Sequence, residues 1–370
     1  MNPYDVDILV LASLVAMSCA IPGVFLVLRK VSLMSDAISH AILLGIVLAF
    51  FLTNSLSSPW LIIGAALTGL LTVSMTEGLI NTRKLKEDAA IGLVFPLLFS
   101  LGVILLTKYA GDVHLDTQCV LFGEIAFTPF ERLIVAGMDL GPKASWVMGA
   151  IFALNVLFVG IFYKELKITT FDPELAASLG FKPVLLNYAL MTIVSITAVG
   201  SFESVGSILV VALMIVPAAA AYLLTDRLAH MILLSAAIGI ASAAGGYFSA
   251  RAFDVNIAGA IASFSGVLFF AALIFAPERG LWAKAVVRKF REYDFASETL
   301  AVHLLQAEQS HAEEAERVVH HMNEHMLWNN QLTSEAIAQA LKDGVIRKDG
   351  ERLSLTAYGR EKAKNILEKG

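Results

Sequence analysis

Long apolar runs repeat along most of this chain, and they limit the folds that it can adopt. Nine runs contain few or no charged residues: 8–28, 33–53, 59–80, 89–107, 145–163, 185–202, 205–224, 229–250 and 255–276. A helix needs about 20 apolar residues to cross a bilayer, and soluble proteins rarely repeat buried helices of this length. The runs therefore predict an all-α polytopic membrane protein, surrounded by lipid, with about nine transmembrane helices.

The charged residues divide the chain into two parts. Hydrophobic residues make up 57% of the sequence and charged residues only 16%, yet the last 80 residues or so read like an ordinary water-soluble protein. We predict a transmembrane domain over 1–285 and a small α+β domain over 292–370.

Lysine and arginine placement predicts the orientation of the spans, because these residues are enriched in cytoplasmic loops. Alternate loops hold most of them: Arg29, Lys30, Arg83, Lys84, Lys86, Lys164, Lys167, Lys182, Arg227 and the cluster from Arg279 to Arg291. Nine spans with these loops inside place the N-terminus outside and the C-terminal domain in the cytoplasm.

Moving a solute through such a bundle requires a source of energy. The sequence contains no G-x-x-x-x-G-K-[ST] phosphate loop, so nucleotide hydrolysis by that route would belong to a partner chain. An ion gradient would call for several carboxylates deep in the spans, and few are present; Glu77 lies near an inner end. The sequence therefore favours a permease that is not itself an enzyme and is driven by a separate ATPase.

One polar pair lies inside the second run. Asp36 and His40 are four residues apart, so they share one helix face. Counted from Lys30, His40 lies about 15 Å deep, near the bilayer midplane. Carboxylate oxygen and imidazole nitrogen suit manganese, iron or zinc. The pair is predicted to line a metal path; the alternative is a structural hydrogen bond that locks the bundle.

Four segments, in order, resemble the ABC-type manganese/zinc/iron permeases, over residues 1 to about 280. They are Leu33–Ala41, Lys86–Gly92, Phe171–Gly180 and Val205–Ala219. The resemblance implies a bacterial plasma-membrane permease that pairs with a second copy or a paralogue. It further implies cytoplasmic ATPase subunits, an extracytoplasmic metal-binding protein, and Asp36 and His40 on the metal path.

The third of these segments also makes sense from its residues alone. An aspartate followed by proline starts a helix well, and glycine ends one. We predict a short amphipathic helix that couples to the ATPase, formed by Asp172, Pro173, Glu174, Leu175, Ala176 and Gly180. The alternative is an ordinary interfacial helix.

The tail is predicted to be winged-helix-like, with a hairpin turning at Lys348-Asp349-Gly350 before a last helix. It resembles the end of the DNA-binding domain of iron- and manganese-dependent repressors. From residue 292 the sequence holds nine lysines and arginines against fourteen acids, which argues against DNA binding and favours a regulatory or protein-contact role.

A histidine pair in the tail could bind metal. His321, Glu324 and His325 have the spacing of ligands on one helical turn, while the alternative is a solvated helix face. Taken together, the sequence predicts the permease subunit of an importer for a divalent metal, manganese first, then zinc or iron. The metal is cargo, and no permanent cofactor is expected. The alternatives are an ion-coupled secondary metal transporter and a membrane-anchored metal sensor.

Overall fold

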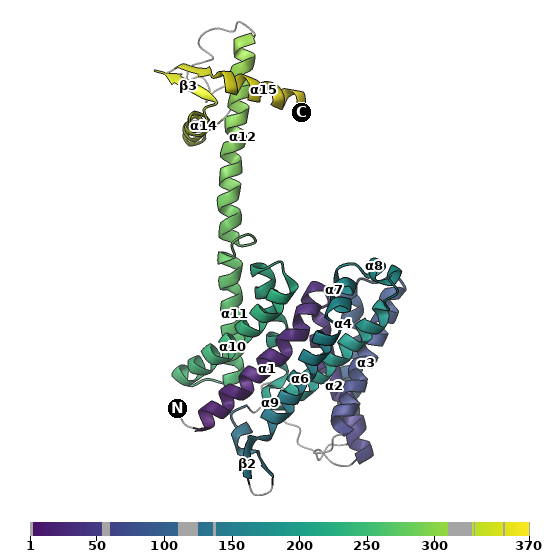
Figure 1. Cartoon of the computed structure of the whole chain (residues 1–370). Coiled ribbons are helices and arrows are strands. Elements are labelled where there is room, and N and C mark those ends of the chain that lie inside the picture. Colours follow the sequence, from purple (N-terminus) through teal and green to yellow (C-terminus); the bar gives the residue numbers. More distant parts are fainter. Residues whose placement is uncertain are drawn as a thin grey trace. The chain divides into compact units, whose positions relative to one another are not determined.

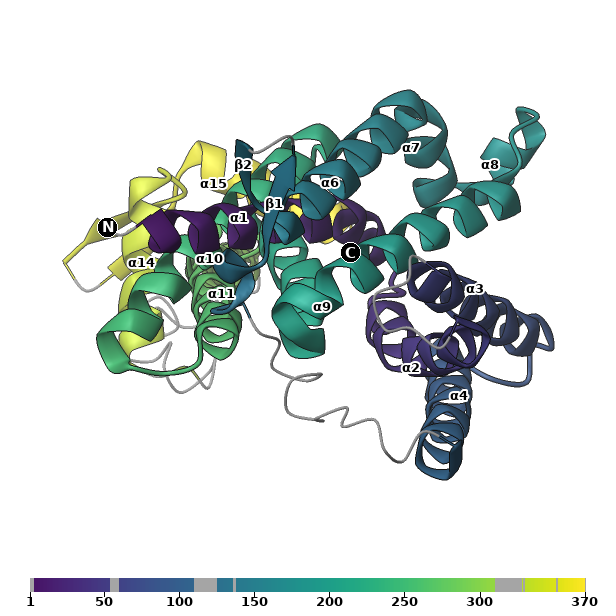
Figure 2. The ribbon, with the colours of Figure 1, turned by 90° about the horizontal axis from the view of Figure 1, so that it is seen from below.

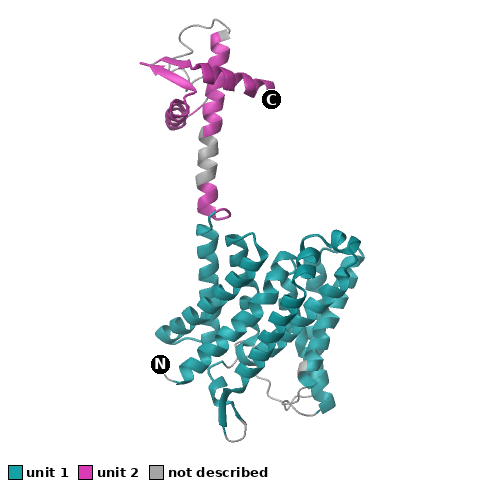
Figure 3. Ribbon diagram, in the orientation of Figure 1, with its two compact units in different colours: residues 1–277 teal, residues 278–370 magenta. Residues whose placement is uncertain are grey.

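The computed structural model describes residues 3–53, 60–109, 125–135, 138–309, 328, 330–350 and 352–369. The chain forms two compact units, Met1–Pro277 and Glu278–Gly370 (Figure 3). Each unit has its own hydrophobic core.

Unit 1 is a bundle of apolar helices with one small hairpin (Figure 1). Its elements are α1 (Pro3–Leu28), α2 (Leu33–Thr53), α3 (Trp60–Asn81), α4 (Glu87–Tyr109), η1 (Thr128–Phe130), β1 (Arg132–Val135), β2 (Met138–Pro142), α6 (Lys143–Ile161), α7 (Tyr163–Phe171), α8 (Pro173–Ser178), α9 (Pro183–Leu224), α10 (Leu228–Phe253) and α11 (Ile257–Phe275). Among the described residues, nine helical segments are long and apolar enough to cross a membrane, as the sequence predicts.

Two of the predicted runs fall within α9, which consists of two helices joined at a kink. Gly206 interrupts it with φ 78° and ψ 164°, a backbone conformation that is essentially restricted to glycine. The two candidate spans on either side are Pro183–Phe202 and Ser204–Leu224. Gly206 therefore marks the kink between the two helices of α9.

The helices of unit 1 form a central group around α1 and a second group beside it. Helix α1 lies at the centre, packed chiefly against α9 and α10. Helices α2, α3 and α4 pack on one another beside it, and Figure 2 shows them as a group. A Cβ on Gly45 would collide with the backbone of Gly64, so α2 and α3 touch through their main chains. Helix α9 contacts both groups and joins them.

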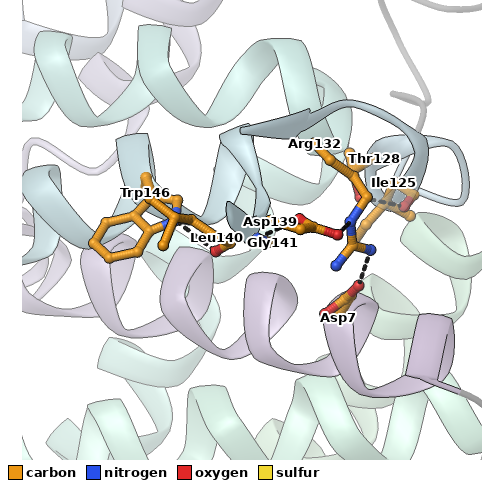
Figure 4. A network of polar contacts seen from close by, with 8 residues as sticks. All are labelled: Asp7, Ile125, Thr128, Arg132, Asp139, Leu140, Gly141 and Trp146. Atoms are coloured by element: carbon orange, nitrogen blue, oxygen red, sulfur yellow. Dashed lines mark hydrogen bonds and ion pairs between the residues drawn. The ribbon is translucent and has the colours of Figure 1, made fainter. Parts of the chain in front are cut away.

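A polar network ties the β1–β2 hairpin to α1 (Figure 4). The hairpin lies at the end of unit 1 opposite α8 (Figure 1). Arg132 donates to Asp7 on α1 at 3.1 Å and to Asp139 on β2 at 2.5 Å. The Gly141 backbone N–H also donates to Asp139. The hydrogen bond from Gly141, and after it the one from Arg132, hold the pKa of Asp139 below its usual value. The sequence analysis did not predict this hairpin.

The start of α1 has a second anchor at this end. Its Asp5 accepts hydrogen bonds from the hydroxyl of Tyr247 and the guanidinium of Arg251, both on α10 and both at 2.7 Å. The two acids at the beginning of the chain are thus structural partners of distant arginines.

Unit 2 is small and mixed in structure. Its described elements are α12 (Leu281–Gln309), α14 (Asn330–Lys342), β3 (Ile346–Asp349), β4 (Arg352–Leu355) and α15 (Ala357–Lys369). The strands pair antiparallel around Gly350, whose φ is 66°, which confirms the predicted hairpin. Helix α15 is held on α12 by an ion pair between Arg360 and Glu308 at 2.8 Å. Helix α12 lies wholly within unit 2.

Candidate functional site

The Asp36–His40 pair lies on α2, as its spacing predicts. Because α2 begins at Leu33, after a turn in which Lys30 has φ 63°, Asp36 belongs to the first helical turn. His40 is one turn further in, about 10 Å along the axis from Leu33 at 1.5 Å per residue, which is shallower than the 15 Å counted from Lys30. The His40 Nε2 and Asp36 Oδ1 atoms are 3.4 Å apart.

The pair occupies the one face of α2 that unit 1 leaves partly open at this depth. The side chains of His40 and Asp36 are 33% and 41% exposed. Their neighbours Ser35, Ala37 and Ser39 are all buried. The two polar side chains are therefore directed away from the packed interior and are accessible to a solute or to another subunit.

Two phenylalanines on α4 flank the His40 ring. Phe95 lies with its ring centroid 5.9 Å away and tilted by 32°, and Phe99 lies at the same distance with its ring nearly perpendicular, at 75°. Such contacts restrict the imidazole to few orientations. The sequence analysis missed both residues; their spacing of four on an apolar helix, after the polar segment Lys86–Gly92, is a signal that could have found them.

A metal site built on Asp36 and His40 alone would be an open one. Within the ranges that the structure describes, no group of three or more histidine, cysteine, aspartate or glutamate side chains is arranged to hold a metal ion. Asp36 and His40 could supply two ligands, and water or another subunit would supply the others. A site of this kind suits an ion that passes through better than one that stays.

The predicted coupling segment forms helix α8, capped at both ends. The Asp172 carboxylate accepts from the Leu175 N–H at 2.9 Å, and Pro173 occupies the first turn. At the other end Gly180 has φ 88°, and the N–H groups of Gly180 and Phe181 donate to the carbonyls of Ala177 and Ala176. This is a Schellman motif. The predicted start and end of the helix are confirmed.

Helix α8 shows apolar side chains at the surface. Ala176 is fully buried, whereas Leu175 is 49% exposed and Leu179 is 58% exposed. Glu174 lies beside them and is also exposed. A short, rigid helix with an apolar outer face can dock into a groove of another protein.

The third predicted site cannot be compared with the structure. His321, Glu324 and His325 all lie outside the described residues.

Unit 1 is thus a bundle of helices that are long and apolar enough to cross a membrane, the architecture of a polytopic membrane protein. A family model described as the ABC 3 transport family matches residues 3–276. The zinc transport system membrane protein TroD of Treponema pallidum is 44% identical over 357 residues, covering 95% of this chain and 96% of that protein. The manganese transport system membrane protein MntD of Bacillus subtilis is 48% identical over 281 residues, covering 76% of this chain and 95% of that protein.

A solved structure has the same fold. It is described as PsaBC from Streptococcus pneumoniae in complex with Fab, and it matches with a TM-score of 0.62 and 31% identity over 75% of this chain and 94% of that chain. The protein belongs to the ABC 3 transport family, as its four segments predicted. It is a membrane permease subunit and not itself an enzyme, since ATP hydrolysis in such transporters belongs to a separate subunit.

Proposed function

We propose that this protein is the permease through which Mn²⁺ or Zn²⁺ enters the cell, with Asp36 and His40 on the path of the ion. The observation that carries the proposal is the open face of α2, where a carboxylate and an imidazole lie 3.4 Å apart. Oxygen and nitrogen ligands of this kind suit both metals. The names of two similar proteins, a zinc and a manganese transport protein, support the same choice; they do not point to iron.

The path needs a second surface. Asp36 and His40 are partly exposed in the single chain, and a carboxylate left against lipid would cost several kcal/mol. A second copy of the permease, or a paralogue, facing this side of α2 would enclose the pair. The ion would then pass between the two subunits.

Helix α8 is the proposed contact with the ATPase. Its rigid caps and its exposed Leu175 and Leu179 support this role. The α8 end would then be cytoplasmic, and the hairpin end would face the extracytoplasmic binding protein across a bacterial plasma membrane. The lysine and arginine placement in the sequence supports the same orientation.

Unit 2 is proposed to be an accessory cytoplasmic domain. The match to the Treponema protein covers 95% of this chain and so includes most of unit 2, whereas the Bacillus protein is matched over 95% of its length by only 76% of this chain. A manganese transport protein of this family therefore exists without a counterpart of unit 2. Regulation or assembly is the role we infer, with His321, Glu324 and His325 as a candidate metal-sensing group.

Metal-resolved uptake tests the proposal. Cells that lack the gene, complemented with this protein and its partner subunits, should regain uptake of Mn²⁺ or Zn²⁺ that needs the ATPase. This uptake should continue after collapse of the proton gradient. Uptake by a proton-coupled secondary transporter would stop under that condition. Restored growth without uptake of either metal would refute the proposed cargo.

A further inference from the structure

Arg29 lies directly after α1 and joins it to two other elements. Its Nε donates to the hydroxyl of Thr170 at 3.1 Å, and its Nη2 donates to the hydroxyl of Thr169 at 3.2 Å; both threonines are on α7. Its Nη1 donates to the amide oxygen of Asn187 on α9 at 2.8 Å. Burial lowers the pKa of Arg29 to about 10, so the guanidinium is charged at neutral pH.

Asn187 extends this contact to α3. Its amide nitrogen donates to a carboxylate oxygen of Glu77, near the end of α3. Asn187 thus accepts from Arg29 and donates to Glu77, and removing either side chain would leave a polar atom of Asn187 without this hydrogen bond. We call Arg29, Thr169, Thr170, Asn187 and Glu77 the Arg29 network.

The backbone next to Arg29 is held in an uncommon conformation. Lys30 has φ 63°, a left-handed conformation that is unfavourable for a residue with a Cβ atom. The N–H groups of Lys30 and Val31 donate to the carbonyls of Val27 and Leu26, which ends α1 in a Schellman motif. The guanidinium therefore extends from a fixed point of the chain.

The network lies between the two parts of the proposed transport machinery. On one side, Thr170 lies two residues before Asp172, the residue that caps α8. The Asp172 N–H donates to the Ile168 carbonyl of α7, which joins the two helices. On the other side, α3 packs against α2, which carries Asp36 and His40, and the two helices touch through Gly45 and Gly64. A displacement of α7 and α8 would reach α3 and α2 through Arg29 and Asn187.

The same contacts exclude a cation site at this place. The guanidinium is a fixed positive charge, and a second cation beside it would be repelled. The Asn187 oxygen is already bound to Arg29, and a Glu77 oxygen to Asn187. A connecting function agrees better with this arrangement than a metal-binding one.

We propose that Arg29 is a positioning residue that transmits the movement of α8 to α3 and the metal-path helix α2. The proposal rests on the proposed function, since it assumes that α8 docks on the ATPase. Loss of the network should separate ATP hydrolysis from transport and leave the assembled complex intact.

The test uses the complete transporter, with its ATPase subunits and binding protein, reconstituted in lipid vesicles. Uptake of Mn²⁺, and of Zn²⁺ in a parallel preparation, is measured together with ATP hydrolysis and melting temperature. Arg29→Met removes every donor at similar length, Arg29→Lys keeps the charge, and Asn187→Leu cuts the link to α3. Thr192→Val is the matched control, because the Thr192 hydroxyl on α9 donates to the carbonyl of Tyr188 in its own helix.

The measured quantity is the number of ions transported per ATP hydrolysed. We expect it to fall at least tenfold in Arg29→Met and Asn187→Leu, to fall less in Arg29→Lys, and to stay unchanged in Thr192→Val. The double variant, Arg29→Met with Asn187→Leu, should transport as many ions per ATP as the poorer of the two single variants, because both substitutions break the same connection. If Arg29→Met fails to assemble, Thr170→Val removes a single bond of the network and should still lower the ratio.

A wild-type ratio in Arg29→Met, Asn187→Leu or an assembled Thr170→Val would overturn the inference, as would an equal fall in Thr192→Val. Absence of uptake of both metals by the unmodified transporter would instead refute the proposed function, and this inference with it.

Discussion

Replacing Asp36 and His40 singly and together distinguishes a transport role from a structural one. The two atoms are 3.4 Å apart, and both side chains are more than 30% exposed. Helix pairs at this spacing and exposure contribute about 0.3–0.5 kcal/mol to stability. For a protein of this size, Asp36→Asn or His40→Ala should therefore lower the melting temperature by about 1–2 °C at most.

Transport should respond far more strongly. If the pair supplies the protein ligands of the path, each single substitution removes one of two. Losing even a residue that only supports a metal ligand costs about 10–100-fold in affinity or activity, so we expect uptake to fall at least tenfold. The large effect on uptake and the small effect on melting are the combination that a transport role predicts.

The assay compares initial uptake of radiolabelled Mn²⁺ with melting temperature in the reconstituted transporter. Ser39→Ala is the control, because Ser39 is a buried neighbour on α2 whose hydroxyl bonds to the Ser35 carbonyl of the same helix. A double replacement of Asp36 and His40 by leucine is the decisive variant. If it folds and still transports metal, the pair is not on the path. If the singles melt much lower and the double recovers, the pair is structural, since apolar groups often replace a buried polar pair without loss.

Other predictions address the remaining parts of the molecule. Glu174→Arg combined with Leu175→Arg should abolish transport without affecting membrane insertion, because it places charge on the face proposed to dock; unchanged metal-stimulated ATP hydrolysis would contradict this. A chain ending at residue 291 should retain most metal uptake, and the intact transporter at submicromolar concentration should not shift a metal-box DNA fragment in a gel. Since the pKa of Asp139 is lowered in the fold, its stabilising effect should be present above the unfolded value of about 3.9 and be lost as the pH falls through the lower folded value. Hydrogen exchange of the hairpin should show this acid step, and Asp139→Asn should remove it; an equal step in the variant would refute the assignment.

Much of the fold could be predicted because the length of a membrane span and the ends of a helix depend on residues that are close in sequence. The nine runs needed only their length and lack of charge, and α8 needed only Asp172, Pro173 and Gly180. The backbone conformation of Gly206 was harder to predict from the sequence. A glycine inside an apolar run usually allows close helix packing, and its positive φ follows from how the two halves of α9 pack on other helices.

The site was predicted only where its residues are neighbours in sequence. Asp36 and His40 are one helical turn apart, so their spacing was sufficient. The flanking Phe95 and Phe99 come from another helix. Arg29, Glu77 and Asn187 are far apart in the chain, and the sequence reading assigned to Glu77 only a location near a span end. Contacts of this kind depend on tertiary packing, which one sequence without its relatives does not specify.

The central position of α1 has a consequence for how the protein is made. Its main neighbours, α9 and α10, begin at Pro183 and Leu228, so a ribosome adding about 5–20 residues per second produces α9 roughly 8–30 s after α1. During that interval Asp5 lacks Tyr247 and Arg251, its later partners on α10, and α1 lacks its main packing neighbours. Helix α1 is thus enclosed only after the much later helices α9 and α10 have been made. Chains truncated before Pro183 should be cleaved in α1 by membrane proteases. Substitutions in α9 or α10 that weaken their packing on α1 should lead to the same cleavage of α1.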